Sequence, residues 1–174
     1  FKSSRLNQGK ILEARLSPRE FSPGRQASLH NIILENSGFE DISPAGFPPG
    51  WTMSDNTTLA YSDGHDKNSV GILIRGQVFQ KKAVTGENNS GPYILSAWIK
   101  TSQEQNAYVQ LESNDLMNIN YHPGDGRWQL ISVVFPRSDA SKDIRVVLGA
   151  DRENAVFDDV RLVLGRKQNL PALP

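Results

Sequence analysis

The sequence predicts an all-β fold, a two-sheet antiparallel β-sandwich, on three observations. Short segments rich in β-branched and aromatic residues recur about every 10 to 15 residues. Clusters of Gly, Pro, Asn and Asp separate them and supply turns, as in "GENNSG" (86–91) and "HPGDG" (122–126). No stretch between 31 and 163 shows a sustained apolar period of 3.6 residues, which argues against alternating β and α units.

The individual strands are predicted from alternating or continuous apolar runs that end at turn residues. Each run is short enough for a strand and carries the Val, Ile, Tyr, Phe, Trp or Thr residues that fit a pleated, half-buried surface. In chain order, the predicted strands are 31–36 ("NIILEN"), 71–84 ("GILIRGQVFQKKAV"), 93–102 ("YILSAWIKTS"), 107–113 ("AYVQLES"), 128–136 ("WQLISVVFP"), 144–150 ("IRVVLGA") and 155–165 ("AVFDDVRLVLG").

Charge and composition divide the chain into three parts. Residues 1–30 carry six basic and two acidic groups and are broken by Pro18, Pro23 and Gly24, which predicts a basic linker or a strap across the sandwich. Residues 31–165 form the predicted sandwich, and 166–174 are a predicted C-terminal tail. Since the chain begins with phenylalanine, we expect a mature or excised piece of a larger protein.

Several partner and function classes are disfavoured. Lys plus Arg equals Asp plus Glu at 19 each, so no overall field attracts nucleic acid, and no apolar run approaches the roughly 20 residues of a membrane helix. The absence of cysteine removes disulfides and thiolate sites. The three histidines (His30, His65, His122) lack metalloprotease spacing, and nothing brings Glu112 and Glu87 together as a hydrolytic pair. We therefore expect that the protein is not an enzyme.

Several short motifs occur in a fixed order between residues 31 and 163. They are "NSGFED", "GW" at Gly50 and Trp51, "GILIRG", "YILSAWIKTS", "WQLISVVF" and "VFDDVRLV". In this order they resemble the jelly-roll carbohydrate-binding modules attached to bacterial xylanases and glucanases. The resemblance implies a jelly-roll sandwich that holds a polysaccharide or oligosaccharide on one sheet, often with a structural calcium ion. It also implies an extracytoplasmic location, periplasmic, cell-surface or secreted, within a larger parent protein.

The resemblance further implies that Glu40 of "GFE" and Asp158 of "DDV" meet at a buried Ca²⁺. Calcium takes six to eight oxygen ligands, and carboxylates with loop carbonyls supply them. Asp158 shares the alternation of Val160 and Leu162, which predicts an inward side chain, whereas Asp159 faces the other side. A second interpretation stays open, in which Glu40 caps a turn and Asp158 accepts backbone hydrogen bonds.

One strand carries the candidate sugar-binding face. In "AYVQLES" the apolar Val109 and Leu111 alternate with Tyr108, Gln110 and Glu112, so a ring stands in line with hydrogen-bonding groups. Its expected neighbours are Arg75 and Gln77, with Gln80, Tyr121 and His122 as further candidates. The alternative is an ordinary polar outer face. The other large aromatic residues, Phe39, Trp51 and Trp98, are predicted core, and Trp128 core or rim.

Two functions follow from these patterns. The first is a non-catalytic carbohydrate-binding module. The alternative is a structural or protein-interaction sandwich of a larger extracytoplasmic or envelope protein, without sugar binding.

Overall fold

The computed structural model describes residues 30–83, 91–113, 116–136 and 143–165, and its regular elements are antiparallel strands. The predicted strap up to residue 29, most of the turn at 86–91 and the predicted tail at 166–174 lie outside the described residues. No helix long and apolar enough to cross a membrane occurs in the described ranges. The strands are β1 (His30–Ile32), β2 (Thr52–Met53), β3 (Thr58–Asp63), β4 (Val70–Ala83), β5 (Tyr93–Lys100), β6 (Ala107–Ser113), β7 (Leu116–Tyr121), β8 (Trp128–Phe135) and β9 (Asp143–Leu164).

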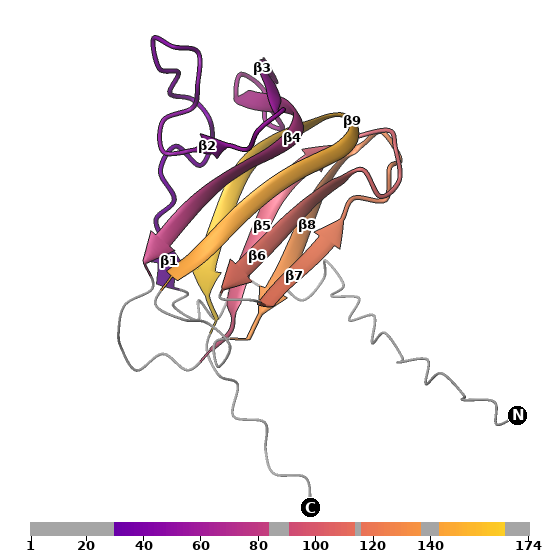
Figure 1. Ribbon diagram of the computed structural model, residues 1–174. Coiled ribbons are helices and arrows are strands. Elements are labelled where there is room, and N and C mark those ends of the chain that lie inside the picture. The colour runs from indigo at the N-terminus through magenta and orange to yellow at the C-terminus, as the bar shows by residue number, and fades with distance from the viewer. Residues whose placement is uncertain (1–29, 84–90, 114–115, 137–142, 166–174) are drawn as a thin grey trace, which may run out of the picture.

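The strands form two layers, which confirms the predicted all-β sandwich (Figure 1). In the front layer, β9 pairs with β4 and β6, while β2 and β7 add to the outer edges of β4 and β6. In the back layer, the later half of β9 pairs with β5, and β5 pairs with β8. The first and last strands pair directly, β1 with the end of β9, as expected if the "GFE" and "DDV" motifs lie close together.

β4 and β9 run through both layers, and each changes layer at an irregularity. The register between them shifts at Ile74 and Gly76, so that four β9 residues, Asp151 to Asn154, have no β4 partner. Gly76 has a φ of +107°, and a Cβ there would lie 2.5 Å from Thr57 Oγ1. The separate strands predicted at 144–150 and 155–165 are therefore wrong in one respect, because a bend in a single strand joins them.

The core lies between the layers and follows the period of two. Along β5, alternate residues Tyr93 to Ile99 are buried, and β8 alternates in the same way from Ile131 to Phe135, whereas β6 is buried on both faces. The fully buried large apolar side chains come from every major strand and from the segment before β2; they are Phe39, Ile72, Ile74, Leu95, Ile99, Leu111, Phe135, Ile144, Leu148, Phe157 and Leu162. Burial of this apolar set is the main force that holds the layers together.

The segment "ENSGFED" closes one end of the sandwich. Phe39 has a φ of 58°, is fully buried and contacts Trp51 at 5.3 Å between ring centroids. The Gln80 side chain binds both backbone groups of Glu35, at 3.1 Å to its N–H and 2.6 Å to its carbonyl. These bonds replace a strand partner, which explains why β1 ends at Ile32 and not at the predicted Asn36.

Three strands were not predicted, namely β2, β3 and β7. β2 has two residues, too few for a pattern. β3 and β7 are mostly exposed or half-buried, and β7 places Asn118 and Asn120 where the alternation would require apolar residues. Their strand conformation depends on pairing with β4 and β6, which local sequence does not report.

Candidate functional site

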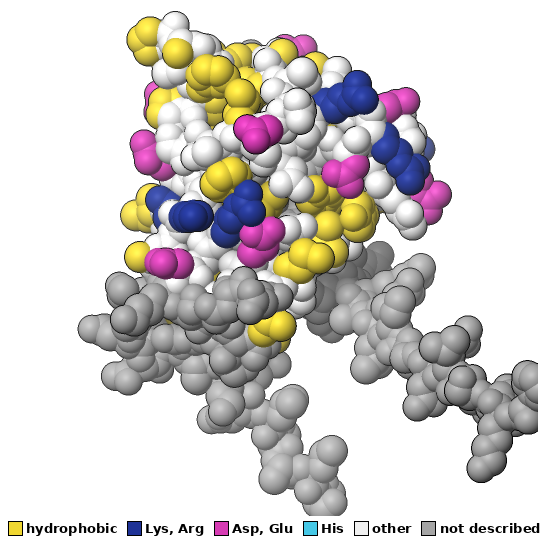
Figure 2. Space-filling view, in the orientation of Figure 1, with side chains coloured by type: hydrophobic (Ala, Val, Ile, Leu, Met, Phe, Trp, Pro, Cys, Tyr) yellow, Lys and Arg dark blue, Asp and Glu magenta, His cyan; other side chains and the backbone are white. Residues whose placement is uncertain are grey.

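The outer face of the front layer carries three of the predicted binding residues on β6. Because Ala107, Val109 and Leu111 are core, the alternate residues point away from it. Each has a neighbour on both sides across the sheet; the rows are Gly149–Tyr108–Tyr121, Val147–Gln110–Ile119 and Arg145–Glu112–Met117. Figure 2 shows this side, where charged side chains of both signs lie beside hydrophobic ones. We call these rows the front face.

Tyr108 lies flat on the sheet and is only 3% exposed. A Cβ on Gly149 would lie 2.2 Å from Tyr108 Cζ, so glycine is what allows the ring to lie there. Its hydroxyl accepts a hydrogen bond from Gln77 Nε2 at 2.7 Å and donates one to Asp151 Oδ1 at 3.2 Å. Burial, with the nearby Asp151 charge, raises the pKa of Tyr108 to about 12, although the Gln77 bond opposes the rise. Tyr108 is thus the base of the front face, not an open platform.

Tyr121 supplies the accessible ring. It lies directly across from Tyr108, with the ring centroids 5.2 Å apart, and is 37% exposed. His122, the next residue, is instead buried at a turn, where Nδ1 accepts from Gly124 N–H at 2.9 Å and Nε2 donates to the Arg127 carbonyl at 2.9 Å. Of these two candidates only Tyr121 presents a surface to a ligand.

A charged cluster occupies the other end of the front face. Arg145 Nη1 lies 2.9 Å from Glu112 Oε2, and Gln110 Nε2 donates to Glu112 Oε1. The Arg145 guanidinium also lies over the Phe79 ring, 3.9 Å from its centroid. Its Nε is buried and has no hydrogen-bond partner in the part of the chain that the structure describes. Sequence reasoning missed Arg145 and Phe79, although both share the outward alternation of their strands.

The remaining predicted neighbours divide between two places. Gln77 joins the front face through its bond to Tyr108. Arg75 lies at the bend of β4, opposite Thr58 of β3, and no contact places it beside Tyr108. Gln80 lies on the opposite face of β4 from Gln77, where it is buried and bonded to Glu35.

Asp158 points to the outer side of the back layer, so the inward orientation predicted from its alternation is wrong. Asp159 has a φ of 48° and falls where the β5 register shifts, and this bulge inverts the alternation on either side. Asp158 therefore pairs with Trp98, on the outer face, and is covered by the loop at 64–69.

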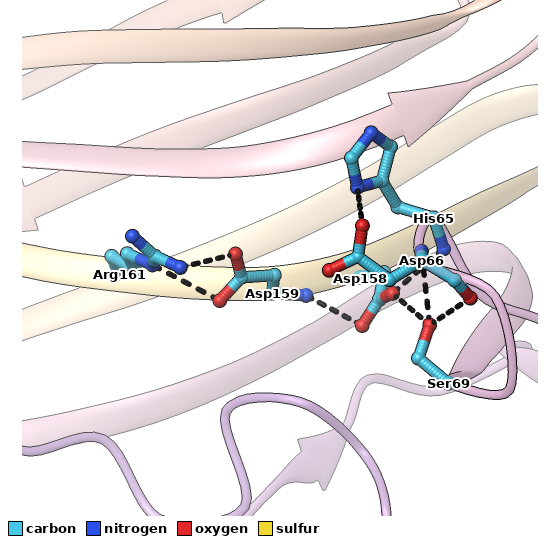
Figure 3. Close-up of polar contacts among 6 residues, drawn as sticks. All are labelled: His65, Asp66, Ser69, Asp158, Asp159 and Arg161. Carbon is cyan, nitrogen blue, oxygen red and sulfur yellow. Dashed lines mark hydrogen bonds and ion pairs between the residues drawn. The ribbon is translucent and has the colours of Figure 1, made fainter.

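The hydrogen bonds that Asp158 accepts determine how many of its oxygen lone pairs are left for a cation. Its Oδ2 accepts from His65 N–H at 2.7 Å and from Ser69 Oγ at 3.0 Å, and its Oδ1 accepts from Asp159 N–H at 2.7 Å (Figure 3). Glu40 Oε1 accepts from Val70 N–H, one residue further along the same loop. Amide donors directed at the carboxylates use some of the oxygen lone pairs that a calcium ion would need. A calcium shared by Glu40 and Asp158 stays a prediction.

Other metal arrangements are also not seen. No group of three or more His, Asp or Glu side chains that would hold a metal occurs in the described ranges. The loop "SDGHDKNS" at 62–69 instead forms a turn in which Ser69 N–H and Ser69 Oγ both donate to the Asp66 carbonyl.

Comparison with solved structures places this chain among jelly-roll-like sandwiches. A Stig cyclase from Fischerella sp. TAU, in complex with a pyrrolidinylidene indole, is similar with a TM-score of 0.60 and 16% identity over 80% of this chain and 99% of that one. The CBM22-1 xylan-binding domain of Paenibacillus barcinonensis Xyn10C has a TM-score of 0.54 and 10% identity over 75% and 92%. TmCBM61 bound to β-1,4-galactotriose has a TM-score of 0.50 and 16% identity over 78% of this chain and 99% of that one. No protein-family model and no curated protein matches the sequence.

These comparisons settle the fold and correct one prediction. Carbohydrate-binding modules are among the similar structures, as the motif order suggests. The prediction that the protein is not an enzyme is contradicted, because cyclases adopt this same fold over almost their whole length. The missing catalytic motifs belong to other folds, so their absence does not bear on catalysis in this one.

Proposed function

We propose that the protein binds a β-linked oligosaccharide or polysaccharide on the front face. The observation that carries the proposal is one accessible ring, Tyr121, beside a layer of polar side chains held in place by one another. A pyranose presents an apolar C–H face for the ring and hydroxyls for amide and carboxylate groups. The fold of xylan-binding and galactotriose-bound modules supports this assignment.

In this proposal each predicted residue except Arg75 has a role. Gln110 and Glu112 hold each other, and Arg145 neutralises the Glu112 carboxylate. Because these side chains are already ordered, less side-chain conformational entropy is lost when a ligand binds. Tyr108 fixes Gln77 and supports Tyr121 from below. Since a single exposed ring and solvent-competed hydrogen bonds give weak association, we expect dissociation constants of about 1 mM.

The test is a nuclear magnetic resonance titration with neutral, acidic and amino oligosaccharides. We expect one class to shift the backbone signals of Gln110, Glu112 and Tyr121. Tyr121→Ala should weaken binding at least about tenfold, because the stacking area is lost. Tyr121→Phe is the matched control: it keeps the ring and should bind within about twofold of the parent. Unchanged signals with every glycan would contradict the proposal.

The alternative function is a structural or protein-interaction domain. It is favoured by Leu116 and Met117, apolar side chains exposed on β7 at the border of the front face. Under this alternative no glycan shifts the front face, and a partner protein protects β7 from hydrogen exchange.

The proposal includes a setting for the protein. We expect the domain to work outside the cytoplasm, where cell-wall polysaccharides are, and as part of a larger parent protein that it holds on the substrate. Fractionation of cells that express the complete parent protein tests the location. Recovery only with the cytoplasmic proteins would argue against it.

A further inference from the structure

A cavity of about 350 Å³ opens on the back layer, on the opposite side of the sandwich from the front face. Residues from the ends of β3 and β5, the start of β8 and the bend of β9 line it. Its volume is at the lower end of the range of small-molecule pockets. We call it the Trp128 cavity, after the aromatic side chain in its wall.

Trp128 is held in place by two further rings. His65 stacks on Trp98 with centroids 3.6 Å apart and an interplanar angle of 9°, and Trp128 meets His65 edge-on at 5.7 Å. Neither tryptophan belongs to the core cluster, so the predicted core position of Trp98 is wrong. His65 thus contacts both tryptophans, and its edge-on contact orients the Trp128 indole before any ligand arrives.

Asp158 fixes this ring cluster from behind. Its bonds to His65 N–H and Ser69 Oγ hold the 64–69 loop against the sheet (Figure 3). The loop places the His65 ring on Trp98. Gly64 leaves room for the carboxylate, since a Cβ there would lie 2.6 Å from Asp158 Oδ2. The "DDV" motif thus acts as a positioning element for the Trp128 cavity.

Five polar side chains line the cavity together with the indole. None of the five makes a side-chain hydrogen bond or ion pair in the part of the chain that the structure describes. They comprise two hydroxyls, one amide, one carboxylate and one ammonium, namely Ser62, Ser102, Asn154, Asp63 and Lys100. Asp63 and Lys100 are both exposed, so neither has lost its hydration to the protein.

We propose that the Trp128 cavity is a second ligand site, which takes a single pyranose unit. The indole meets the apolar face of the sugar ring, Asp63 accepts hydrogen bonds from its hydroxyls, and the ammonium of Lys100 donates to a ring substituent. One cation beside one anion is poor for a phosphate, and five free polar groups are poor for an apolar ligand. The small volume limits the ligand to one unit.

The test follows the indole Nε1–H signals of the three tryptophans during titration with xylose, galactose, glucosamine and glucuronate. We expect at least one sugar to shift the Trp128 signal together with the amides of Lys100 and Ser102, and to leave Trp51 unmoved. Trp128→Ala should weaken that binding at least about tenfold. Lys100→Gln should weaken glucuronate more than galactose, since it removes the one ammonium in the cavity.

Two further variants test whether binding is specific to this cavity and guard against loss of fold. Ser132→Ala changes an exposed side chain on β8 outside the cavity and should bind as the parent does. Asp63→Asn preserves the rings, so weaker binding with unchanged ring signals supports the site even where Trp128→Ala fails to fold. The proposal is overturned if no sugar moves the Trp128 indole, or if Lys100→Gln and Asp63→Asn both bind as the parent does. Shifts confined to Tyr121 and Gln110 would also overturn it while supporting the front face.

Discussion

A tyrosine on the outward side of a strand can still be buried. Tyr108 alternates with core residues as the sequence predicts, yet the absence of a side chain at Gly149 lets its ring lie down on the sheet. Gln77 and Asp151 then hold the hydroxyl from two different strands. As a consequence, the ring that is exposed to solvent is that of Tyr121 on the neighbouring strand β7.

Tyr108→Phe should lower the free energy of unfolding by about 1 to 2 kcal/mol near neutral pH, because Gln77 and Asp151 lose a partner. The folded pKa of Tyr108 is about 12, raised above the ordinary 10.0, so the neutral hydroxyl is favoured in the folded protein. That contribution is complete below about pH 10 and is lost as the pH rises through about 12.

Urea denaturation of the parent and Tyr108→Phe at about pH 9 and about pH 11 measures this effect. The difference in unfolding free energy between them should shrink by about 1.4 kcal/mol at the higher pH, since only the parent carries the group that titrates. A difference that is constant or grows with pH would contradict the assigned burial.

A single carboxylate organises one loop of the back layer. Asp158 accepts three hydrogen bonds and is 3% exposed. Each donor comes from the loop at 64–69 or from the bulge at Asp159, so the side chain joins two segments that are remote in sequence. Removal of the Asp158 carboxylate would therefore leave buried hydrogen-bond donors unpaired.

Asp158→Ala should lower the unfolding free energy by about 2 to 4 kcal/mol, because the N–H groups of His65 and Asp159 lose their acceptor. Thermal melting with and without a chelator checks the cause. If the three hydrogen bonds alone hold Asp158, the parent melting temperature is the same with and without chelator. A lower melting temperature in chelator, absent in Asp158→Asn and accompanied by calcium in elemental analysis, would instead support the calcium prediction.

At the scale of single strands, β7 protects an edge of the back layer. Asn118 and Asn120 point inward from β7, and their amides donate to the carbonyls of Val134 and Ser132 of β8 at 2.7 and 2.8 Å. β8 pairs only with β5 among the described strands, so these carbonyls would otherwise stand at an open edge. The two layers are joined there by side chains and not by a backbone ladder.

Replacing both Asn118 and Asn120 with alanine should cost about 1 to 3 kcal/mol and expose the β8 edge to pairing with other copies. Urea denaturation measures the first effect and light scattering against protein concentration the second. Met117→Ser, on the outward side of the same strand, is the control and should change neither. Equal stability and a monomeric double variant would contradict this function of β7.

At the scale of the whole molecule, β4 and β9 connect the layers into one unit. Both strands contribute to the front and back sheets and change layer together at Gly76 and Asp151. If one sheet unfolds, the other loses strand partners, because β4 and β9 belong to both. The front face and the Trp128 cavity therefore share a single scaffold although they lie on opposite sides.

Unfolding should accordingly be one cooperative transition. In urea, the native signals of Gln110 in the front layer and Trp98 in the back layer should disappear at the same midpoint, together with the far-ultraviolet circular dichroism. Two separated midpoints would show that the layers unfold independently, contrary to the shared strands.

The period of two along the chain was sufficient to predict the sandwich, most strands and the outward set Tyr108, Gln110 and Glu112. Alternation is a local property, and burial of one strand face follows from it directly. That the first and last strands lie near each other was also expected, from the hypothesis that the "GFE" and "DDV" motifs meet at one site; the pairing of β1 with β9 agrees with it.

Tertiary structure alone decided what each outward residue does. The bulge at Asp159 inverted the orientation of Asp158, and the neighbour Gly149 buried Tyr108, and neither is encoded in the alternation of a single strand. The Trp128 cavity needs His65, Trp98 and Trp128 from three segments to meet. Sequence by itself determined which face of each strand is apolar; contacts between distant segments, which depend on register and bulges, determined which polar and aromatic groups remain free for a ligand.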